Sequence, residues 1–162
     1  MLDVREAYET HADFVWQSLA RLGCAPSDRA DLLQETFVVL HRRRADWDGR
    51  SLRGWLWGIC VGLMRNHRRR AFRRVETLVA EVEVAAAPMV DAIERRRRMD
   101  NGQRALAELD VEQRAVFVMF EIEQLSGREI SEALEIPLGT VHSRLFSARK
   151  TLARRLQEFE DE

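Results

Sequence analysis

Between residues 138 and 158 the apolar side chains recur with the period of an α-helix. They are spaced four, three, four and four residues apart, so on a helix they fall within about 80° of one another; these residues are Val141, Leu145, Ala148, Leu152 and Leu156. A shorter helical segment, 126–134, precedes this one, and Ile136 and Pro137 mark a tight turn between the two. A short helix, a turn and a longer amphipathic helix predict a helix-turn-helix.

The opposite face of the 138–158 segment is polar and basic. No acid occurs from 136 to 157, whereas the helix before it carries Glu129, Glu132 and Glu135. An ordinary helical hairpin with a solvated face is the alternative, but this asymmetry of sign favours a helix that enters the major groove of DNA. The residues that we expect to face DNA, some suited to phosphates and others to base edges, are Thr140, His142, Ser143, Arg144, Phe146, Ser147, Arg149 and Lys150.

The rest of the chain also has helical period, and it has few turn residues, with three prolines and eight glycines in 162 residues. We therefore expect an all-α fold with further helices over 4–22, 28–43, 51–73, 102–109 and 111–123. Ser27 is the expected N-cap of the second helix. The segment 75–100 is acidic, rich in Ala and Val and interrupted by Pro88, which indicates a linker with fragile helical pieces. It divides the chain into two small helical domains, 1–74 and 101–162.

The helix expected over 51–73 has apolar residues on two faces. One face has the spacing of a stripe directed at a core and holds Leu52, Trp55, Leu56, Ile59 and Leu63. Trp57, Val61 and Met64 lie on another face. These three side chains either pack on the first helix or stay exposed for a partner.

A basic block lies inside a chain whose net charge is only −1. From 41 to 74 there are eleven arginines against Asp46 and Asp48. Solvated faces usually mix charges of both signs, so we interpret this block as a contact surface for a polyanion rather than as a solvated helix end. Unpaired bases stack on aromatic side chains, and the block contains Trp47, Trp55, Trp57 and Phe72. Trp55 also lies on the core stripe, which is the alternative role for its ring.

Other classes of function lack the residues that they need. No apolar run approaches the roughly 20 residues of a membrane span, and the N-terminus does not resemble a signal peptide, so we expect a cytoplasmic protein with no membrane insertion. Cys24 and Cys60 lack the spacing of a metal site or a disulfide framework, and the four histidines form no ligand set. We therefore expect no catalytic residues, no metal and no cofactor.

Two groups of motifs stand out. The first consists of Asp31-Leu-Leu-Gln-Glu-Thr-Phe37, Ser51-Leu-Arg-Gly-Trp-Leu56 and an arginine-rich tail to Arg70. The second consists of Leu125-Ser-Gly-Arg-Glu-Ile-Ser131, Ile136-Pro-Leu-Gly-Thr-Val-His-Ser-Arg-Leu145 and Ala148-Arg149. In this order and spacing they resemble sigma domains 2 and 4 of the extracytoplasmic-function (ECF) family of RNA polymerase sigma factors.

The resemblance implies a bacterial promoter-specificity subunit, whose partners are core RNA polymerase and promoter DNA. On the polymerase, the implied contacts are a coiled coil of the largest subunit and the flap region. The coiled coil would contact the helix that includes 31–41, through Asp31, Leu33, Gln34, Glu35 and Val38. An anti-sigma factor that covers the polymerase- and DNA-binding faces is a further partner that the resemblance implies. The chemistry of RNA synthesis would belong to the polymerase.

The resemblance also implies that both domains contact DNA. The loop 46–51 and the helix after it would capture and melt the minus-ten element, through Trp47, Asp48, Arg50, Arg53, Arg65, Asn66 and Arg69. The helix-turn-helix would read the minus-thirty-five element as a duplex. The chain departs from the usual residues of the family at Gly62, Asn66 and Ser147.

Gly58, Gly62, Arg65 and Arg69 form one stripe of the helix over 51–73. The two glycines either let this stripe approach the DNA backbone closely or allow tight packing against another helix.

Two other functions compete with that of a sigma factor. A stand-alone helix-turn-helix regulator accounts for 126–155 but leaves the segment 31–74 without a role. Such a regulator should bind duplex DNA tightly without polymerase. A protein-interaction module of helical hairpins should show no salt-dependent binding to DNA.

Overall fold

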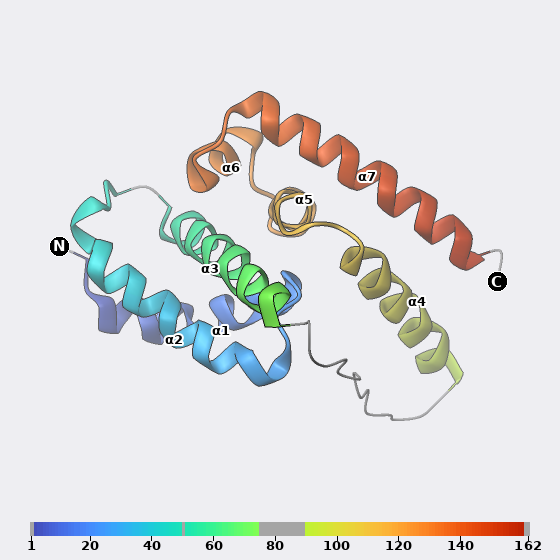
Figure 1. Cartoon of the computed structure of the whole chain (residues 1–162), viewed down its shortest axis with the longest axis horizontal. Helices are drawn as coiled ribbons and strands as arrows, with labels where there is room; N and C mark the ends of the chain where they lie inside the picture. The colour runs from blue at the N-terminus through green and yellow to red at the C-terminus, as the bar shows by residue number, and fades with distance from the viewer. Residues whose placement is uncertain (1, 50, 75–89, 161–162) are drawn as a thin grey trace.

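The computed structural model describes residues 2–49, 51–74 and 90–160, and these residues form helices and loops without a strand. The N-terminal half contains α1 (Val4–Arg21), α2 (Pro26–Arg43), the 3₁₀ turn η1 (Arg44–Asp46) and α3 (Leu52–Arg74). The C-terminal half (Figure 1) contains α4 (Val90–Ala107), α5 (Val111–Phe117), the π-helical turn η3 (Val118–Ile122), α6 (Gly127–Leu134) and α7 (Leu138–Glu160). The predicted all-α fold is confirmed. Among the described helices, none has the length and apolar character needed to cross a membrane.

Side-chain caps explain where two of the helices begin. The Asp3 carboxylate accepts hydrogen bonds from the backbone N–H groups of Arg5 and Glu6 at the start of α1. At the start of α6, Ser126 and Glu129 form a reciprocal capping box, in which each side chain accepts from the backbone N–H of the other residue. Both caps satisfy N–H groups that a helix leaves without an internal partner.

Two helix boundaries differ from the prediction. Helix α2 begins at Pro26 and not after an N-cap at Ser27, because the proline ring presets φ and its missing N–H would have no partner in the first turn. Helix α4 begins at Val90, inside the segment predicted as a linker. The part of that prediction that concerns 75–89 lies outside the described residues.

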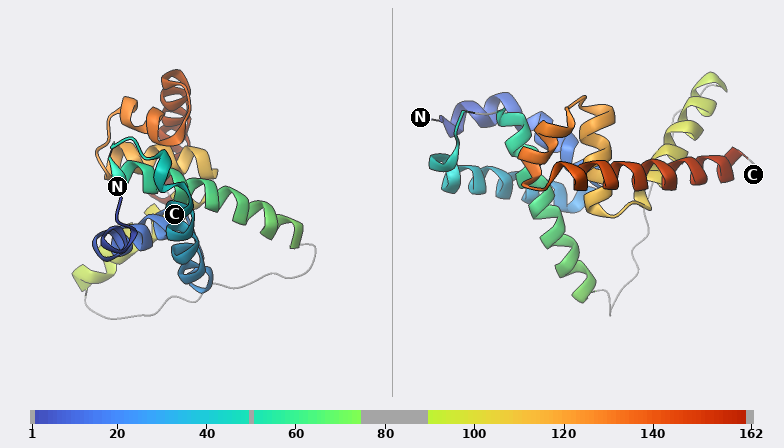
Figure 2. Two further views of the ribbon diagram at one scale, coloured as in Figure 1. Left: turned by 90° about the vertical axis from the view of Figure 1, so that its left-hand side faces the viewer. Right: turned by 90° about the horizontal axis from the view of Figure 1, so that it is seen from above.

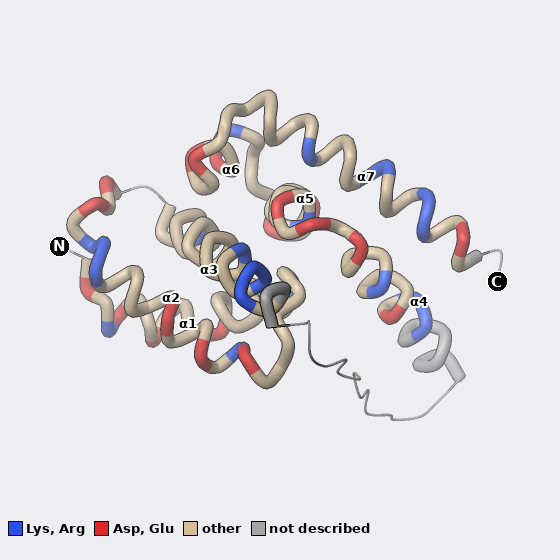
Figure 3. Tube along the Cα trace, in the orientation of Figure 1, with Lys and Arg blue, Asp and Glu red and all other residues tan. Residues whose placement is uncertain are grey.

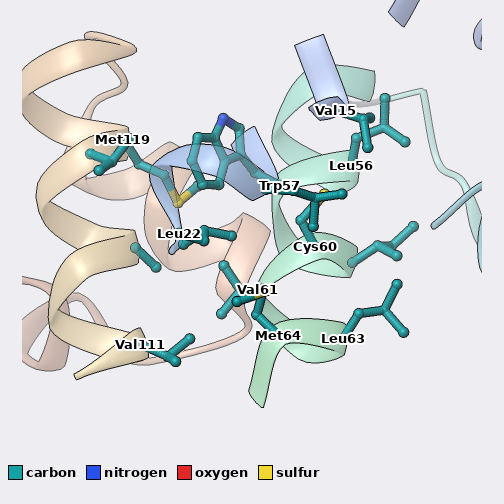
Figure 4. Packing of buried hydrophobic residues seen from close by; sticks show 14 of the residues in the cluster. Val15, Leu22, Leu56, Trp57, Cys60, Val61, Leu63, Met64, Val111 and Met119 are labelled. Carbon is teal, nitrogen blue, oxygen red and sulfur yellow. The ribbon is translucent and has the colours of Figure 1, made fainter. Parts of the chain in front are cut away.

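Helix α3 is the part of the N-terminal half that packs against the C-terminal half, and it is buried on two faces. Its second apolar face is as buried as the first: Trp57, Val61 and Met64 are 1%, 2% and 1% exposed. Figure 4 shows this face directed toward Leu22 at the end of α1 and toward Met119 of η3. The three side chains therefore pack on the first helix and on the C-terminal half together, and one apolar cluster runs through both halves.

Helices α3 and α6 meet at Gly58. A Cβ added to Gly58 would lie 2.2 Å from the carbonyl oxygen of Ala133, so a residue without a side chain is needed for this approach of the two helices. Tight helix packing therefore accounts for Gly58. A Cβ added to Gly62 would have no atom within 4 Å, and close approach to DNA stays a prediction there.

Helices α6 and α7 form the predicted helix-turn-helix. Glu135 ends α6 in the left-handed region, with φ of 54°, and the Ser131 hydroxyl donates to the Ile136 carbonyl oxygen at 2.6 Å. In the stripe predicted for α7, Leu156 differs from the other four residues, because it is 44% exposed while they are buried. Figure 2 shows that the last turns of α7 extend beyond α5 and α6.

Candidate nucleic-acid and polymerase interfaces

The outer face of α2 carries the residues predicted to bind polymerase. Asp31, Gln34 and Val38 are exposed, and their spacing of three and four residues places them along one side of the helix. Val38 is 45% exposed, so an apolar side chain lies at the surface among polar ones. Glu35 is half-buried on the same side, whereas Leu33 packs against the core.

A cavity of about 270 Å³ lies between the loop after η1 and helix α6. Trp47, Asp48 and Trp55 line it from the N-terminal half. From the C-terminal half, α6 and the residues on either side of it contribute Leu125, Glu129, Glu132, Ala133 and Glu135. The loop residues predicted to capture the minus-ten element therefore face acidic side chains of the C-terminal half. Arg50, predicted for the same role, lies outside the described residues.

Two arginines of α3 that were predicted to contact the minus-ten element are bonded to carboxylates of the C-terminal half. Arg53 Nη2 donates to Glu123 Oε2 at 3.2 Å, and its guanidinium lies 4.3 Å from the centre of the Phe14 ring. Arg65 Nε donates to Glu112 Oε1 at 2.6 Å. The other predicted residues of α3 are exposed; they are Asn66 and Arg69.

Glu123 bonds two arginines at once. Besides Arg53, it accepts a hydrogen bond from Arg21 Nη1 in the last turn of α1. The Glu123 side chain is 10% exposed, against 56% for Arg53 and 37% for Arg21. A carboxylate that is this buried needs compensating positive charge, so both bonds hold the end of η3 against α1 and α3.

A buried guanidinium, absent from the sequence-based prediction, also joins the two halves. Arg114 on α5 is 7% exposed and donates its Nε–H to the carbonyl oxygen of Arg21. Arg68 Nη2 donates to the carbonyl oxygen of Leu22 at 3.4 Å, so two cations bind the end of α1, where the helix dipole favours positive charge. Burial lowers the pKa of Arg114 to about 10, and the nearby charge of Arg68 acts in the same direction. In the sequence, only the position of Arg114 directly before the apolar run 115–120 hints at its burial.

The outer face of α7 carries the residues predicted to read the minus-thirty-five element. Phe146 is 70% exposed, the largest exposed fraction among the large apolar side chains that the structure describes. Three polar residues of this face are also exposed: His142, Ser143 and Lys150. Three more are half-buried: Thr140, Arg144 and Ser147. The helix thus offers one large apolar contact among small polar and basic groups.

Arg149 differs from the rest of this face, because it is bonded to an acid of another element. Its Nη2 and Nε donate to Glu121 Oε1 at 2.5 and 2.9 Å. The prediction considered acids on the helix itself and missed Glu121, which belongs to η3. Together with Glu112 and Glu123, Glu121 completes a set of carboxylates that each hold an arginine predicted to contact DNA. No local sequence pattern links these acids to their arginines.

The described residues contain no group of three or more His, Cys, Asp or Glu side chains placed to hold a metal ion. Cys24 and Cys60 are both buried, and neither forms a disulfide. Burial raises the pKa of the Cys60 thiol to about 12, which disfavours the reactive thiolate.

Both halves of the chain match known families. Residues 7–74 match the family described as Sigma-70 region 2, and residues 103–152 match the family described as Sigma-70, region 4. The ECF RNA polymerase sigma factor SigF of Caulobacter vibrioides is 31% identical over 144 residues, which cover 86% of this chain and 76% of the relative. SigE of Mycolicibacterium smegmatis, also named an ECF RNA polymerase sigma factor, is 35% identical over 151 residues. That match covers 91% of this chain and 59% of SigE.

Solved structures with the same fold cover nearly the whole chain. CnrH, solved in complex with the cytosolic domain of CnrY, has a TM-score of 0.66 and 25% identity, over 96% of this chain and 88% of that chain. The sigma factor RpoE from Bartonella quintana, solved with the anti-sigma factor NepR, has a TM-score of 0.74 and 19% identity, over 94% of this chain and 96% of that chain.

Proposed function

Because this chain belongs to the extracytoplasmic-function (ECF) family of RNA polymerase sigma factors, we propose that it binds core RNA polymerase and directs transcription initiation at specific promoters. The observation that carries the proposal is the pair of sigma-70 regions matched in order on one chain, over 7–74 and 103–152. A stand-alone helix-turn-helix regulator finds no support here, since it leaves the matched segment 7–74 without a role.

In this proposal residues 1–74 act as sigma domain 2 and residues 101–162 as sigma domain 4, with 75–100 as the connection. The first turns of α4 belong to that connection, because the helix begins at Val90. The chain has no chemistry of its own to perform, since the polymerase forms the phosphodiester bonds, and it works in the cytoplasm where the polymerase is.

The exposed side of α2 is the surface that we assign to the polymerase. Val38 supplies apolar area to be buried, and Asp31 and Gln34 on the same side supply polar contacts around it. A partner that covers this side would not disturb the core, because the buried residues of α2 lie on its other side: Leu32, Thr36, Phe37 and Leu40.

Two surfaces are assigned to DNA. Trp47 and Trp55 line the cavity beside α6, and their rings suit the stacking of unpaired bases from a melted minus-ten element. The outer face of α7 suits a duplex, with Phe146 for a thymine methyl group and the polar side chains for phosphates and base edges. One domain would thus bind strand-separated DNA while the other binds the duplex.

A protein regulator is part of the proposal. CnrH was solved with the cytosolic domain of CnrY, and RpoE with an anti-sigma factor. By this likeness we propose that an anti-sigma factor of the same general class binds the present chain and competes with polymerase.

The test is addition of the purified chain to bacterial core polymerase, followed by transcription from genomic fragments of the source organism. The wild-type chain should form a complex and yield new transcripts. Charge reversal at Asp31 and Glu35 together should abolish both, because the polar contacts of α2 would become repulsive. Glu9→Arg, an exposed acid on α1, is the control variant and should keep both activities. No complex with core, together with tight duplex binding by the chain alone, would contradict the proposal.

A further inference from the structure

We propose that the turn between α1 and α2 binds a phosphate group of a small ligand through the guanidinium groups of Arg68 and Arg114. The ligand is either inorganic phosphate or a nucleotide that presents its terminal phosphate. Neither arginine is among the residues assigned above to polymerase or DNA. The site therefore adds a third kind of ligand to this protein, and it does not rest on the proposed function.

The first support is the convergence of two like charges on one point. Arg68 lies on α3 and Arg114 on α5, so the two side chains approach the turn from different halves of the chain. A Cβ added to Gly23 would lie 3.1 Å from Arg68 Nη2 and 2.7 Å from Arg114 Nη1. Two cations held this close repel each other, and an anion beside both of them offsets the repulsion. Figure 3 shows further basic positions gathered toward the end of α3.

The second support is that neither guanidinium has an acidic partner in the described part of the chain. Arg114 Nε donates to the carbonyl oxygen of Arg21, and Arg68 Nη2 donates to that of Leu22 at 3.4 Å. These are the only hydrogen bonds of the two groups among the described residues. Because a guanidinium has five N–H donors, most donors of both groups are available to a ligand.

A neighbouring arginine shows how an acid compensates charge at this junction. Arg65, one turn before Arg68 on α3, donates to Glu112 of α5 at 2.6 Å. In contrast, Arg68 and Arg114 bond only main-chain carbonyl groups at the end of α1. The C-terminal end of a helix carries about half a negative charge. This is much less than the two positive charges that the arginines bring.

The third support is the burial of Arg114, which is 7% exposed. A charge removed from water is unfavourable unless an opposite charge or new hydrogen bonds replace the water. Burial and the charge of Arg68 lower the pKa of Arg114 to about 10, so at neutral pH its positive charge destabilises the fold. A bound anion would reduce this destabilisation, and ligand binding would therefore raise the stability of the chain.

The turn itself is open to solvent. Gly23 and Ala25 are both exposed, and Gly23 has a φ of 88°, in the left-handed region that favours glycine. The Cβ of any other residue at position 23 would meet both guanidiniums. The glycine therefore leaves the two groups uncovered, and a small ligand can reach them at the surface.

A third guanidinium borders the same turn. Arg29 Nη2 donates to the Cys24 carbonyl oxygen at 3.2 Å, and the guanidinium lies 5.1 Å from the centre of the Trp16 ring. Among the described residues, its buried Nε has no hydrogen-bond partner. Asp28, the acid next to Arg29 in the sequence, is bonded to His67 at 3.1 Å. Positive charge therefore predominates around the turn.

Phosphate is the ligand chemistry that fits this arrangement. A guanidinium can bind phosphate through two parallel N–H···O bonds, and two converging guanidiniums can hold different oxygens of one phosphate. At neutral pH a terminal phosphate group carries a charge of about −1.5 to −2, which matches two arginines. A carboxylate or a chloride ion carries only a single charge and would leave one arginine uncompensated.

The test is isothermal titration calorimetry of the full wild-type chain without polymerase, with inorganic phosphate and ADP as separate probes. Chloride keeps the ionic strength constant, so that general screening by salt is the same throughout. The wild-type chain should bind at least one probe with a saturable one-to-one isotherm. Arg68→Gln should weaken this binding at least about tenfold, because charge-assisted hydrogen bonds are lost. Tighter binding of ADP would assign the site to a nucleotide, and equal or tighter binding of phosphate would assign it to the free ion.

The matched control is Arg70→Gln, which removes an exposed arginine from the same helix and should keep the wild-type affinity. Arg68→Lys keeps the charge but loses the planar fork, so its affinity should be intermediate. Arg114→Gln should also lose binding once circular dichroism shows that it is folded. If it does not fold, Arg68→Gln alone decides. No saturable binding of either probe to the wild-type chain, or equal affinity in Arg68→Gln and Arg70→Gln, would overturn the proposal.

Thermal denaturation gives a second measurement of the same site. The midpoint of unfolding should rise with probe concentration in the wild-type chain and in Arg70→Gln, and much less in Arg68→Gln. Equal rises in the three proteins would also count against the site. Polymerase and promoter DNA are absent from both measurements. A chain that supports transcription but binds no phosphate would therefore refute this site and leave the sigma-factor function standing.

Discussion

The side chains of Arg53 and Glu123 lie 3.2 Å apart although 70 positions separate them in the chain. Arg53 lies in the first turn of α3, and Glu123 directly follows the π-helical turn η3. The arginine that ties the two halves together is therefore also one that we assign to DNA. One guanidinium cannot serve a carboxylate and a phosphate fully at the same time. On this assignment, the bond to Glu123 would have to open before Arg53 could contact DNA fully.

Replacing Phe146 with Ala should weaken DNA recognition without a loss of stability. The side chain is 70% exposed, so the free energy of unfolding should change by less than about 0.5 kcal/mol. Transcription from a minus-thirty-five-dependent promoter should fall, because an apolar contact with a base is lost. Leu152→Ala is the opposite case: the residue is 7% exposed, and its truncation should cost about 2–4 kcal/mol. Urea denaturation followed by circular dichroism measures the free energy of unfolding of both variants, and transcription with core polymerase measures DNA recognition. Normal transcription by Phe146→Ala would show that Phe146 does not contact the minus-thirty-five element.

Replacing Glu121 with Gln should strengthen the binding of duplex DNA by the full chain. Arg149 then loses its carboxylate partner, which accepts from its Nε and Nη2, and can turn to a phosphate. The slope of log affinity against log salt concentration should steepen by about one unit. Fluorescence anisotropy with a labelled duplex over a range of salt concentrations measures this slope. Glu135→Gln removes the same charge from the end of α6, where the nearest ion-pair partner is Arg43, and should leave the slope unchanged. A similar slope in the two variants would mean that Arg149 does not contact the backbone.

Protonation of His11 should destabilise the fold in weak acid. Burial lowers the pKa of His11 below its ordinary value of 6.5, and the positive charge of Arg53 lowers it further. The unfolded chain therefore takes up this proton at a higher pH than the folded chain does. It follows that the free energy of unfolding decreases as the pH falls below about 6.5.

The measurement is urea denaturation of the wild-type chain and of His11→Gln at about pH 7.5 and about pH 5.5. Other groups titrate in both proteins and affect both equally. The difference between the two decreases in the free energy of unfolding therefore measures the contribution of His11. The decrease should be smaller in His11→Gln. An equal decrease in both proteins would show that this imidazole contributes nothing to the acid sensitivity.

Helical periodicity predicted most of the elements, because a helix that buries one side repeats apolar residues every three or four positions. It located α1, α3, α6 and α7 to within about two residues at each end. The buried residues Val141, Leu145, Ala148 and Leu152 were recognised from the same repeat. The start of α2 was misplaced because the prediction used Ser27 as the N-cap, whereas the helix begins at Pro26.

Periodicity cannot tell which element covers a face, and this limit explains what was missed at the candidate site. Trp57 lies on a recognisable apolar face of α3, yet nothing near it in the sequence specifies that Met119 will pack there. The same holds for the pairing of Glu121 with Arg149, which depends on how two separately patterned segments dock. The residues of the site could thus be proposed individually from the sequence. Which carboxylate bonds which arginine could not be predicted.

The second apolar face of α3 has a consequence for the order of events during synthesis. Translation completes Met64 well before Met119, and at roughly 5–20 residues per second the interval is on the order of several seconds. During this interval Trp57, Val61 and Met64 of the N-terminal half can pack only on the end of α1, because their partners on α5 and η3 have not yet been made. The newborn N-terminal half therefore exposes apolar area that the complete chain buries, and Arg53 and Arg65 can bond Glu123 and Glu112 only after the C-terminal half has been made.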